Sequence, residues 1–132
     1  MNVGLWPDDP LDNIQLSGLK AKNYDNHLNL VNTKVTCWYP QAFNNVIVEI
    51  HDSDLADLQW NIGEVTFIIY NSTCVTALSM QEVEYQFYDS YIHGDVTAKE
   101  DSKIYLYNTE VNGEYNEVDN GQIFIEDIPY TK

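Results

Sequence analysis

Arginine is absent from this sequence. Its basic residues are six lysines, set against 21 Asp and Glu residues, and the formal net charge is −15. A nucleic-acid-binding protein needs a cationic surface to displace phosphate counterions, and arginine is its usual base-reading residue. The composition therefore argues against nucleic acid, anionic membranes and phosphorylated ligands as partners. Two interpretations of the charge stay open: it serves solubility, or it steers a basic protein partner into contact.

Long apolar runs and a signal peptide are also lacking. No segment approaches the ~18 consecutive apolar residues that cross a membrane, and the first residues have neither a basic nor an apolar leader region. We therefore expect a cytoplasmic protein. The only cysteines, Cys37 and Cys74, lie in apolar neighbourhoods, so we expect reduced thiols and leave a bridge between them open. We interpret the sequon Asn71-Ser72-Thr73 as turn composition, because a secretory signal is missing.

Helical periodicity is missing, and no internal repeat is recognised. Apolar and polar residues instead alternate in short segments such as Glu82–Tyr88 and Lys103–Asn108, and short apolar runs occur at Val46–Ile50 and Val65–Tyr70, with turn residues between them. The pattern predicts an all-β, mostly antiparallel fold over residues 1–132: a single acidic domain built as a β-sandwich or small barrel, with little or no helix. At most one helical turn is expected, within Thr97–Lys103.

The stretch Val46–Tyr70 predicts a β-hairpin at the centre of this fold. It opens with the apolar run Val46–Ile50, breaks at His51–Asp54 and alternates from Ala56 to Ile62. A turn follows near Gly63, and Val65–Tyr70 is the most apolar strand of the sequence. Asn112-Gly113 predicts a type I′ turn, in which both central residues need a positive φ. Asp119-Asn120-Gly121 predicts a further turn before the last strand.

The densest group of chemically reactive side chains is His51-Asp52-Ser53-Asp54 with Asp57. An EF-hand loop is excluded because Asp57 stands where glycine is required, and a serine nucleophile would need a Gly-x-Ser-x-Gly elbow. We interpret the group as a corner between strands, where Asp52 and Ser53 bond backbone amides. No metal, cofactor or catalytic residue is assigned, and neither His27 nor His93 receives a role.

The region between Lys103 and Lys132 has no basic residue and combines carboxylates with tyrosines. Aromatic side chains provide rigid contact area, and carboxylates provide charge complementarity. The alternative is a solvated acidic hairpin that protects an edge strand from aggregation. The predicted partner-binding residues are Tyr105, Tyr107, Glu110, Glu114, Tyr115, Glu117 and Asp119.

The run His51-Asp52-Ser53, followed by Leu55, a strand ending at Trp60, the Gly63 turn and the strand Val65–Tyr70, resembles small bacterial β-domains. Among these are immunity proteins of polymorphic-toxin and contact-dependent inhibition systems. The resemblance is confined to residues 46–70, and it implies a cytosolic single-domain inhibitor that binds one cognate toxin. No toxin-contacting residue is carried over by this motif.

We therefore expect a non-enzymatic acidic binding protein that inhibits a basic partner. The specific hypothesis is an immunity protein that occludes the active site of a nuclease-type toxin, or a phage antagonist of a nucleic-acid defence system. A structural or accessory β-domain of a phage or secretion apparatus and a ligand- or metal-binding β-barrel remain as alternatives. An enzyme is not expected, because no nucleophile–base pair or cofactor motif is visible. The oligomeric state is left open.

Overall fold

The computed structural model describes residues 14–15, 27–32, 34–35, 38–39, 45–60 and 64–131. Within these residues the chain forms strands and no helix. The strands are β1 (Ile14–Gln15), β2 (His27–Val31), β3 (Lys34–Val35), β4 (Trp38–Tyr39), β5 (Val46–His51), β6 (Asp54–Leu55), β7 (Leu58–Trp60), β8 (Val65–Tyr70), β9 (Thr73–Cys74), β10 (Ala77–Met80), β11 (Glu84–Tyr88), β12 (Tyr91–Ile92), β13 (Val96–Lys99), β14 (Lys103–Tyr107), β15 (Glu110–Val111), β16 (Tyr115–Val118), β17 (Gln122–Ile125) and β18 (Ile128–Pro129).

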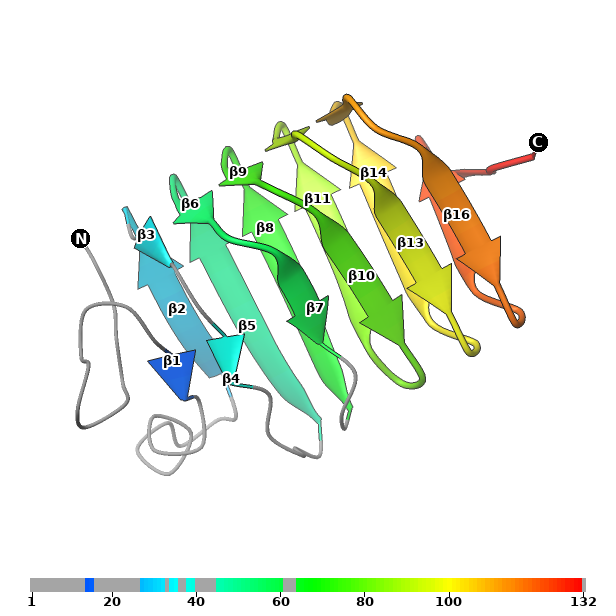
Figure 1. Ribbon diagram of the computed structural model, residues 1–132. Helices are drawn as coiled ribbons and strands as arrows, with labels where there is room; N and C mark the ends of the chain where they lie inside the picture. The colour runs from blue at the N-terminus through cyan, green and yellow to red at the C-terminus, as the bar shows by residue number, and fades with distance from the viewer. Residues whose placement is uncertain are drawn as a thin grey trace.

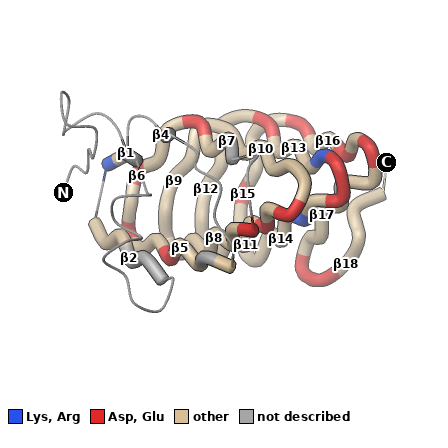
Figure 2. Tube along the Cα trace, turned by 90° about the horizontal axis from the view of Figure 1, so that it is seen from below, with Lys and Arg blue, Asp and Glu red and all other residues tan. Residues whose placement is uncertain are grey.

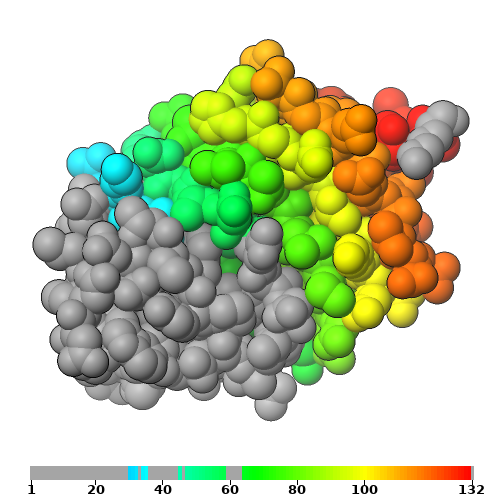
Figure 3. All heavy atoms as spheres, viewed as in Figure 1, coloured from blue at the N-terminus to red at the C-terminus, as the bar shows by residue number. Residues whose placement is uncertain are grey.

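The strands wind into a β-solenoid of about four turns (Figure 1). Equivalent strands of successive turns pair in parallel and build three sheets, and β1 pairs separately with β4. The long sheet has the order β18-β17-β14-β11-β8-β5-β2, the narrow sheet β15-β12-β9-β6-β3, and the front sheet β16-β13-β10-β7. The long and front sheets face each other as two layers, which Figure 2 shows from below. Figure 3 shows the same face as Figure 1 with all heavy atoms, where the colours pass from green through yellow to orange as β10, β13 and β16 follow one another along the front sheet.

The turns of the solenoid repeat every 18 to 20 residues. On the long sheet Val31 pairs with His51, His51 with Tyr70, and Tyr70 with Tyr88. The expectation that the sequence has no internal repeat is therefore wrong. The repeat is one of structure, and most of its positions vary in residue type from turn to turn.

The predicted fold class is correct in being all-β and wrong in its architecture. The expected antiparallel sandwich or barrel is a mostly parallel solenoid, and Val46–Tyr70 is not a hairpin. Its strands β5 and β8 lie side by side in parallel, because the chain passes through β6 and β7 before it returns. Alternation reports only that one face of a strand is buried, so it does not distinguish a parallel neighbour from an antiparallel one.

The backbone tests two further local predictions. The region Thr97–Lys103 contains no helical turn, which is within the expected limit of one, and β13 passes into β14 through Glu100 and Asp101, whose φ angles are 51° and 66°. Asn112 has no positive φ, so the type I′ turn expected at Asn112-Gly113 is not formed. The positive φ angles that such a turn needs occur instead at Asp119 and Asn120, at 48° and 68°.

The core lies between the sheets and consists of aligned rows of apolar side chains. One row on the long sheet contains Val48, Phe67, Tyr85 and Ile104, each with 0% of its surface exposed. The rings of Phe67 and Tyr85 meet edge to face at 5.4 Å, and the Tyr85 hydroxyl donates to the carbonyl of Leu78 across the core at 2.6 Å. Burial of each such side chain stabilises the fold by ~1.5–3 kcal/mol.

The last turn ends in a short antiparallel hairpin of β17 and β18. Glu126 and Asp127 form its tip with positive φ angles, and the Tyr130 amide donates to the Ile123 carbonyl at 2.7 Å. Pro129 in β18 has no backbone N–H to offer to a further strand. The hairpin therefore covers this end of the long sheet and hinders edge-to-edge pairing there.

Candidate functional site

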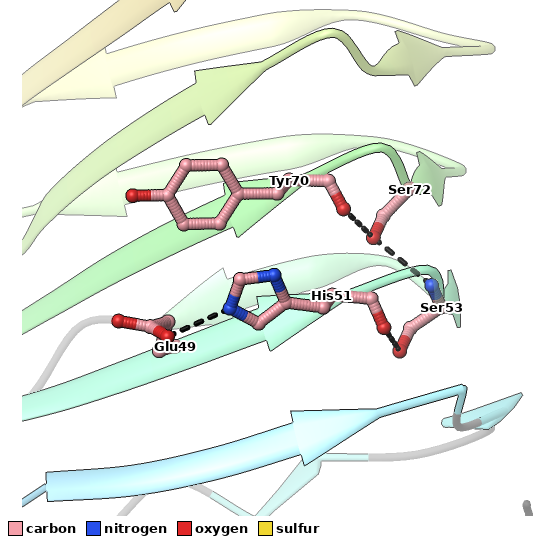
Figure 4. Close-up of polar contacts among 5 residues, drawn as sticks. All are labelled: Glu49, His51, Ser53, Tyr70 and Ser72. Atoms are coloured by element: carbon pink, nitrogen blue, oxygen red, sulfur yellow. Dashed lines mark hydrogen bonds and ion pairs between the residues drawn. The ribbon is translucent and has the colours of Figure 1, made fainter.

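The predicted corner at His51–Asp54 turns the chain from the long sheet into the narrow sheet. Asp52 has a φ of 52°, a left-handed conformation that Asp and Asn tolerate better than most residues. The Ser53 hydroxyl donates to the His51 carbonyl at 2.8 Å, and the Ser53 amide donates to Ser72 Oγ at 3.0 Å (Figure 4). The corner is a turn, as expected, but its bonding differs from the prediction: the Ser53 hydroxyl donates to a backbone carbonyl, and Asp52 Oδ1 accepts from the Asn71 side-chain amide at 2.7 Å.

The same bonding recurs at each successive corner. The hydroxyls of Ser72, Ser90 and Thr109 donate to the carbonyls two residues before them at 2.7, 2.8 and 2.9 Å. The amide of Ser72 donates to Ser90 Oγ at 3.2 Å, and that of Ser90 to Thr109 Oγ1 at 3.4 Å. We call the set Ser53, Ser72, Ser90 and Thr109 the hydroxyl ladder. It provides side-chain acceptors for the corner amides and adds a second donor to carbonyls that also accept a backbone amide, as Tyr70 does from Asp52 at 3.1 Å.

Neither metal nor thiol chemistry has a visible site among the described residues. They contain no group of three or more His, Cys, Asp or Glu side chains that could hold a metal ion, and Asp54 accepts a hydrogen bond from the Thr73 hydroxyl at 2.7 Å. Cys74 is a free, buried thiol, and its burial raises its pKa to about 12. It is therefore unreactive as a nucleophile. Cys37 and the side chain of His27 lie outside the described residues.

The predicted partner-binding residues fall on one turn of the solenoid, which passes through all three sheets. Tyr105 and Tyr107 lie on the outer face of the long sheet, with parallel rings 6.4 Å apart. Glu110 lies on the narrow sheet, and Glu114 is exposed in the turn before β16. The structure thus brings together only the two tyrosines among these four residues.

The other three predicted residues lie towards the hairpin end of the solenoid. The Tyr115 ring packs against that of Tyr130 at 5.0 Å and contacts the core. Glu117 accepts a hydrogen bond from the Ile123 amide at 2.7 Å through Oε2, while Asp119 lies in the exposed turn after β16. Tyr115 and Glu117 therefore have structural contacts of their own.

The most extended constellation of functional side chains lies on the outer face of the long sheet. The rings of His51, Tyr70, Tyr88 and Tyr107 stack in register, at centroid distances of 4.7, 5.0 and 4.9 Å and interplanar angles of 11°, 16° and 12°. We call these four the aromatic column. Beside the column, the Tyr105 ring stacks on the ring of Phe124, which belongs to the next turn of the solenoid, at a centroid distance of 4.9 Å. The aromatic face comprises His51, Tyr70, Tyr88, Tyr105, Tyr107 and Phe124.

The stacking decides which ligands this face suits. Each inner ring of the column is covered on both faces by its neighbours, so ring edges and hydroxyl groups face the solvent. A sugar that stacks, or a cation that binds over a ring, requires a free ring face. A flat protein surface can instead pack on the ring edges. The geometry therefore favours a macromolecular partner.

Carboxylates border the aromatic face. Glu49 Oε2 lies 2.7 Å from His51 Nε2 (Figure 4), and the Tyr107 hydroxyl donates to Asp127 Oδ1 at 2.7 Å. This hydrogen bond is the main cause that raises the pKa of Tyr107 to about 12, and desolvation is the main cause that raises the pKa of Tyr88. Both hydroxyls are protonated at neutral pH, and each donates within the protein, since the Tyr88 hydroxyl bonds the Gln86 side-chain oxygen at 3.1 Å.

Other acidic residues are located mainly at the turns between strands, as the red segments of the Cα trace in Figure 2 show. Sequence reasoning found Tyr105 and Tyr107 but missed the rest of the aromatic face. The signal for the aromatic column is the placement of ring residues at positions 51, 70, 88 and 107, one structural repeat apart.

None of the described residues forms a helix long and apolar enough to span a membrane. The chain matches no protein-family model, no curated protein and no solved structure.

Proposed function

We propose that this protein is a non-enzymatic binding protein that inhibits a basic protein partner, and that it docks through the aromatic face. The observation that carries the proposal is a continuous outward row of stacked rings on a chain with a net charge of −15. Tyrosine is enriched at protein interfaces because it provides rigid contact area together with a hydrogen-bonding group. The surrounding charge would steer a cationic partner towards this face.

Inhibition would act by occlusion. Lysine and arginine side chains that hold phosphate in a nuclease active site would instead meet the carboxylates of Glu49, Asp127 and Glu84, while the tyrosine row covers the adjoining surface. Glu84 begins β11 and alternates with the buried residues Tyr85 and Phe87. An immunity protein against a nuclease-type toxin has this mechanism, as does a phage antagonist of a nucleic-acid defence system. The resemblance of residues 46–70 to immunity-type β-domains favours the first of these two forms.

The outer face of the long sheet is smaller than a standard interface, so the acidic turns also have to contribute to the contact. We call this outer face the platform. Strands five to six residues long, spaced ~4.8 Å apart, give a platform of about 400 Å² over the six parallel strands. A standard interface buries ~800 Å² on each partner. The rim of such an interface therefore has to include the turns that flank the long sheet, such as those at Asp52 and Asp89.

A structural role by end-to-end assembly is less well supported. The antiparallel β17–β18 hairpin covers one end of the long sheet, and Pro129 removes a backbone donor from its outer strand. A repeating assembly through this end would have to displace the hairpin. The outer face of the long sheet needs no such rearrangement to bind a partner.

The test is an inhibition assay with matched surface variants. Immobilised wild-type protein is used to capture basic proteins from the native host, and each captured protein is purified and assayed for nuclease activity with and without the inhibitor. We expect stoichiometric inhibition that weakens with increasing salt and is lost in the double variant Tyr70→Ser, Tyr88→Ser. Thr97→Ala on the front sheet is the control and should inhibit like the wild type. Equal inhibition by both variants, or capture without any inhibition, would reject the proposal.

A further inference from the structure

The three tyrosines of the aromatic column form a continuous stack of oxidisable phenols. Tyr88 lies between Tyr70 and Tyr107, at centroid distances of 5.0 and 4.9 Å. The pairs come from neighbouring parallel strands in exact register, so the sheet itself holds the rings together. All three side chains are partly exposed on the outer face, where a diffusing oxidant can reach them.

Only one of these phenols has a hydrogen-bonded carboxylate to take its proton. The Tyr107 hydroxyl donates to Asp127 Oδ1 at 2.7 Å, whereas the Tyr88 hydroxyl donates to the amide oxygen of Gln86 at 3.1 Å. Loss of an electron makes a phenol strongly acidic, so a carboxylate in this position favours oxidation of the tyrosine that it accepts from. An amide oxygen does not hold a transferred proton. Tyr107 is therefore the end of the stack where a radical is stabilised.

We propose that Tyr88 and Tyr107 are a modification site at which one-electron oxidants form a dityrosine bond between two turns of the solenoid. Each tyrosine gives one electron to an oxidant molecule and loses its phenolic proton, that of Tyr107 passing to Asp127 and that of Tyr88 to water. The two radicals then form a carbon–carbon bond between their ortho positions. The ortho protons return to the oxygens and restore both phenols, so the net loss is two electrons and two protons. Stacking makes the coupling step intramolecular.

A second tyrosine pair in the protein provides an internal comparison. Tyr115 and Tyr130 are 5.0 Å apart, but their rings are tilted by 31°, and Tyr130 belongs to the segment after the β17–β18 hairpin. The two pairs have similar ring separations and differ in their alignment and in the carboxylate at Tyr107. A link between Tyr115 and Tyr130 would stay within one tryptic peptide, so the two products are separable.

Lys103 makes the proposed bond directly measurable. It lies between Tyr88 and Tyr107, and the sequence has no arginine and no lysine from position 104 to 131, so trypsin releases residues 104–132 from the rest of the chain. Dilute protein is irradiated with ruthenium tris-bipyridyl and persulfate, digested, and analysed by mass spectrometry. We expect residues 104–132 to be joined to the peptide that contains Tyr88, with a mass two hydrogens below their sum and fragments that place the bond at Tyr107.

Matched variants decide the outcome. Tyr107→Phe should abolish the joined peptide, Asp127→Asn should lower its yield, and Tyr105→Phe should leave it unchanged. The inference is overturned if the joined peptide is absent from the wild type, if it persists in Tyr107→Phe, or if it forms with equal yield in urea, where the stack is lost. A cross-link between Tyr115 and Tyr130 within residues 104–132, without any joined peptide, would also count against it.

Discussion

Replacement of Ser72 by alanine tests the hydroxyl ladder most directly. Ser72 is 4% exposed, its hydroxyl donates to the Tyr70 carbonyl at 2.7 Å, and its Oγ accepts from the Ser53 amide at 3.0 Å. Ser72→Ala removes the Oγ acceptor of the Ser53 amide, while the Tyr70 carbonyl keeps its bond from the Asp52 amide at 3.1 Å. A buried polar group that loses its partner costs about 1–3 kcal/mol. We therefore expect a loss of about 1–3 kcal/mol in the free energy of unfolding.

Urea unfolding followed by circular dichroism provides the measurement. With a slope of ~2 kcal/mol per M, the midpoint should fall by about 1 M while the slope stays the same. Thr73→Ala is the control, because its hydroxyl bonds Asp54 in solvent and should change stability by less than ~0.5 kcal/mol. Ser72→Thr should keep most of the stability, since Thr109 occupies the equivalent position on the ladder. If Ser72→Ala and Thr73→Ala shift the midpoint equally, the ladder has no special role.

Three further predictions follow from single sites. Gly121→Ala should lower the free energy of unfolding by ~1–3 kcal/mol or more, measured in urea, because its Cβ would overlap the backbone carbonyl of Ala98. In a Cys37→Ser background, Cys74 should react with Ellman's reagent only after unfolding, because burial raises its pKa to about 12. Tyr107 holds its proton more tightly folded than unfolded, since its pKa is raised from 10.0 to about 12. The resulting stability is present below pH 10 and is lost as the pH rises towards 12, so Tyr107→Phe should flatten the alkaline limb of a stability–pH profile.

The sequence was sufficient to place individual strands. The apolar run Val65–Tyr70 predicted a strand, and β8 has these bounds, with every second residue buried. Val46–Ile50 is likewise contained in β5, and most of Glu82–Tyr88 in β11. Strand pairing could not be predicted in the same way, because the partner of β5 in the long sheet is reached only after two further strands.

The solenoid signal was present but distributed among short segments. An Asn or Asp followed by Ser or Thr occurs at 52–53, 71–72, 89–90 and 108–109, at each corner between the long and narrow sheets. Taken singly, 52–53 indicated a corner and 71–73 a chance sequon. Their common spacing is what indicates a stacked repeat. The variable residues between these pairs hide the repeat from a comparison of whole segments.

The predicted partner-binding residues do not form one surface, and the winding of the chain again explains why. The C-terminal acidic region was interpreted as one patch because its residues are close in sequence. In a solenoid, however, neighbours on one surface are a full turn apart, and residues of one turn are distributed over three sheets. Tyr105 and Tyr107 belong to a shared surface with Tyr70 and Tyr88, while Glu110 and Tyr115 lie on other sheets.

Ring stacking in the aromatic column contributes to the stability of the long sheet, but stability alone does not explain why the rings lie there. Stacked cross-strand pairs stabilise a sheet by ~0.2–1 kcal/mol each. The front sheet uses the same solenoid geometry, yet its equivalent outward row reads Leu78, Thr97 and Asn116, with no stacked rings. The solenoid therefore forms without such a row on every sheet. Because the fold does not require the rings, the stacked row on the outer face of the long sheet, beside carboxylates on a strongly acidic chain, supports the proposed binding surface.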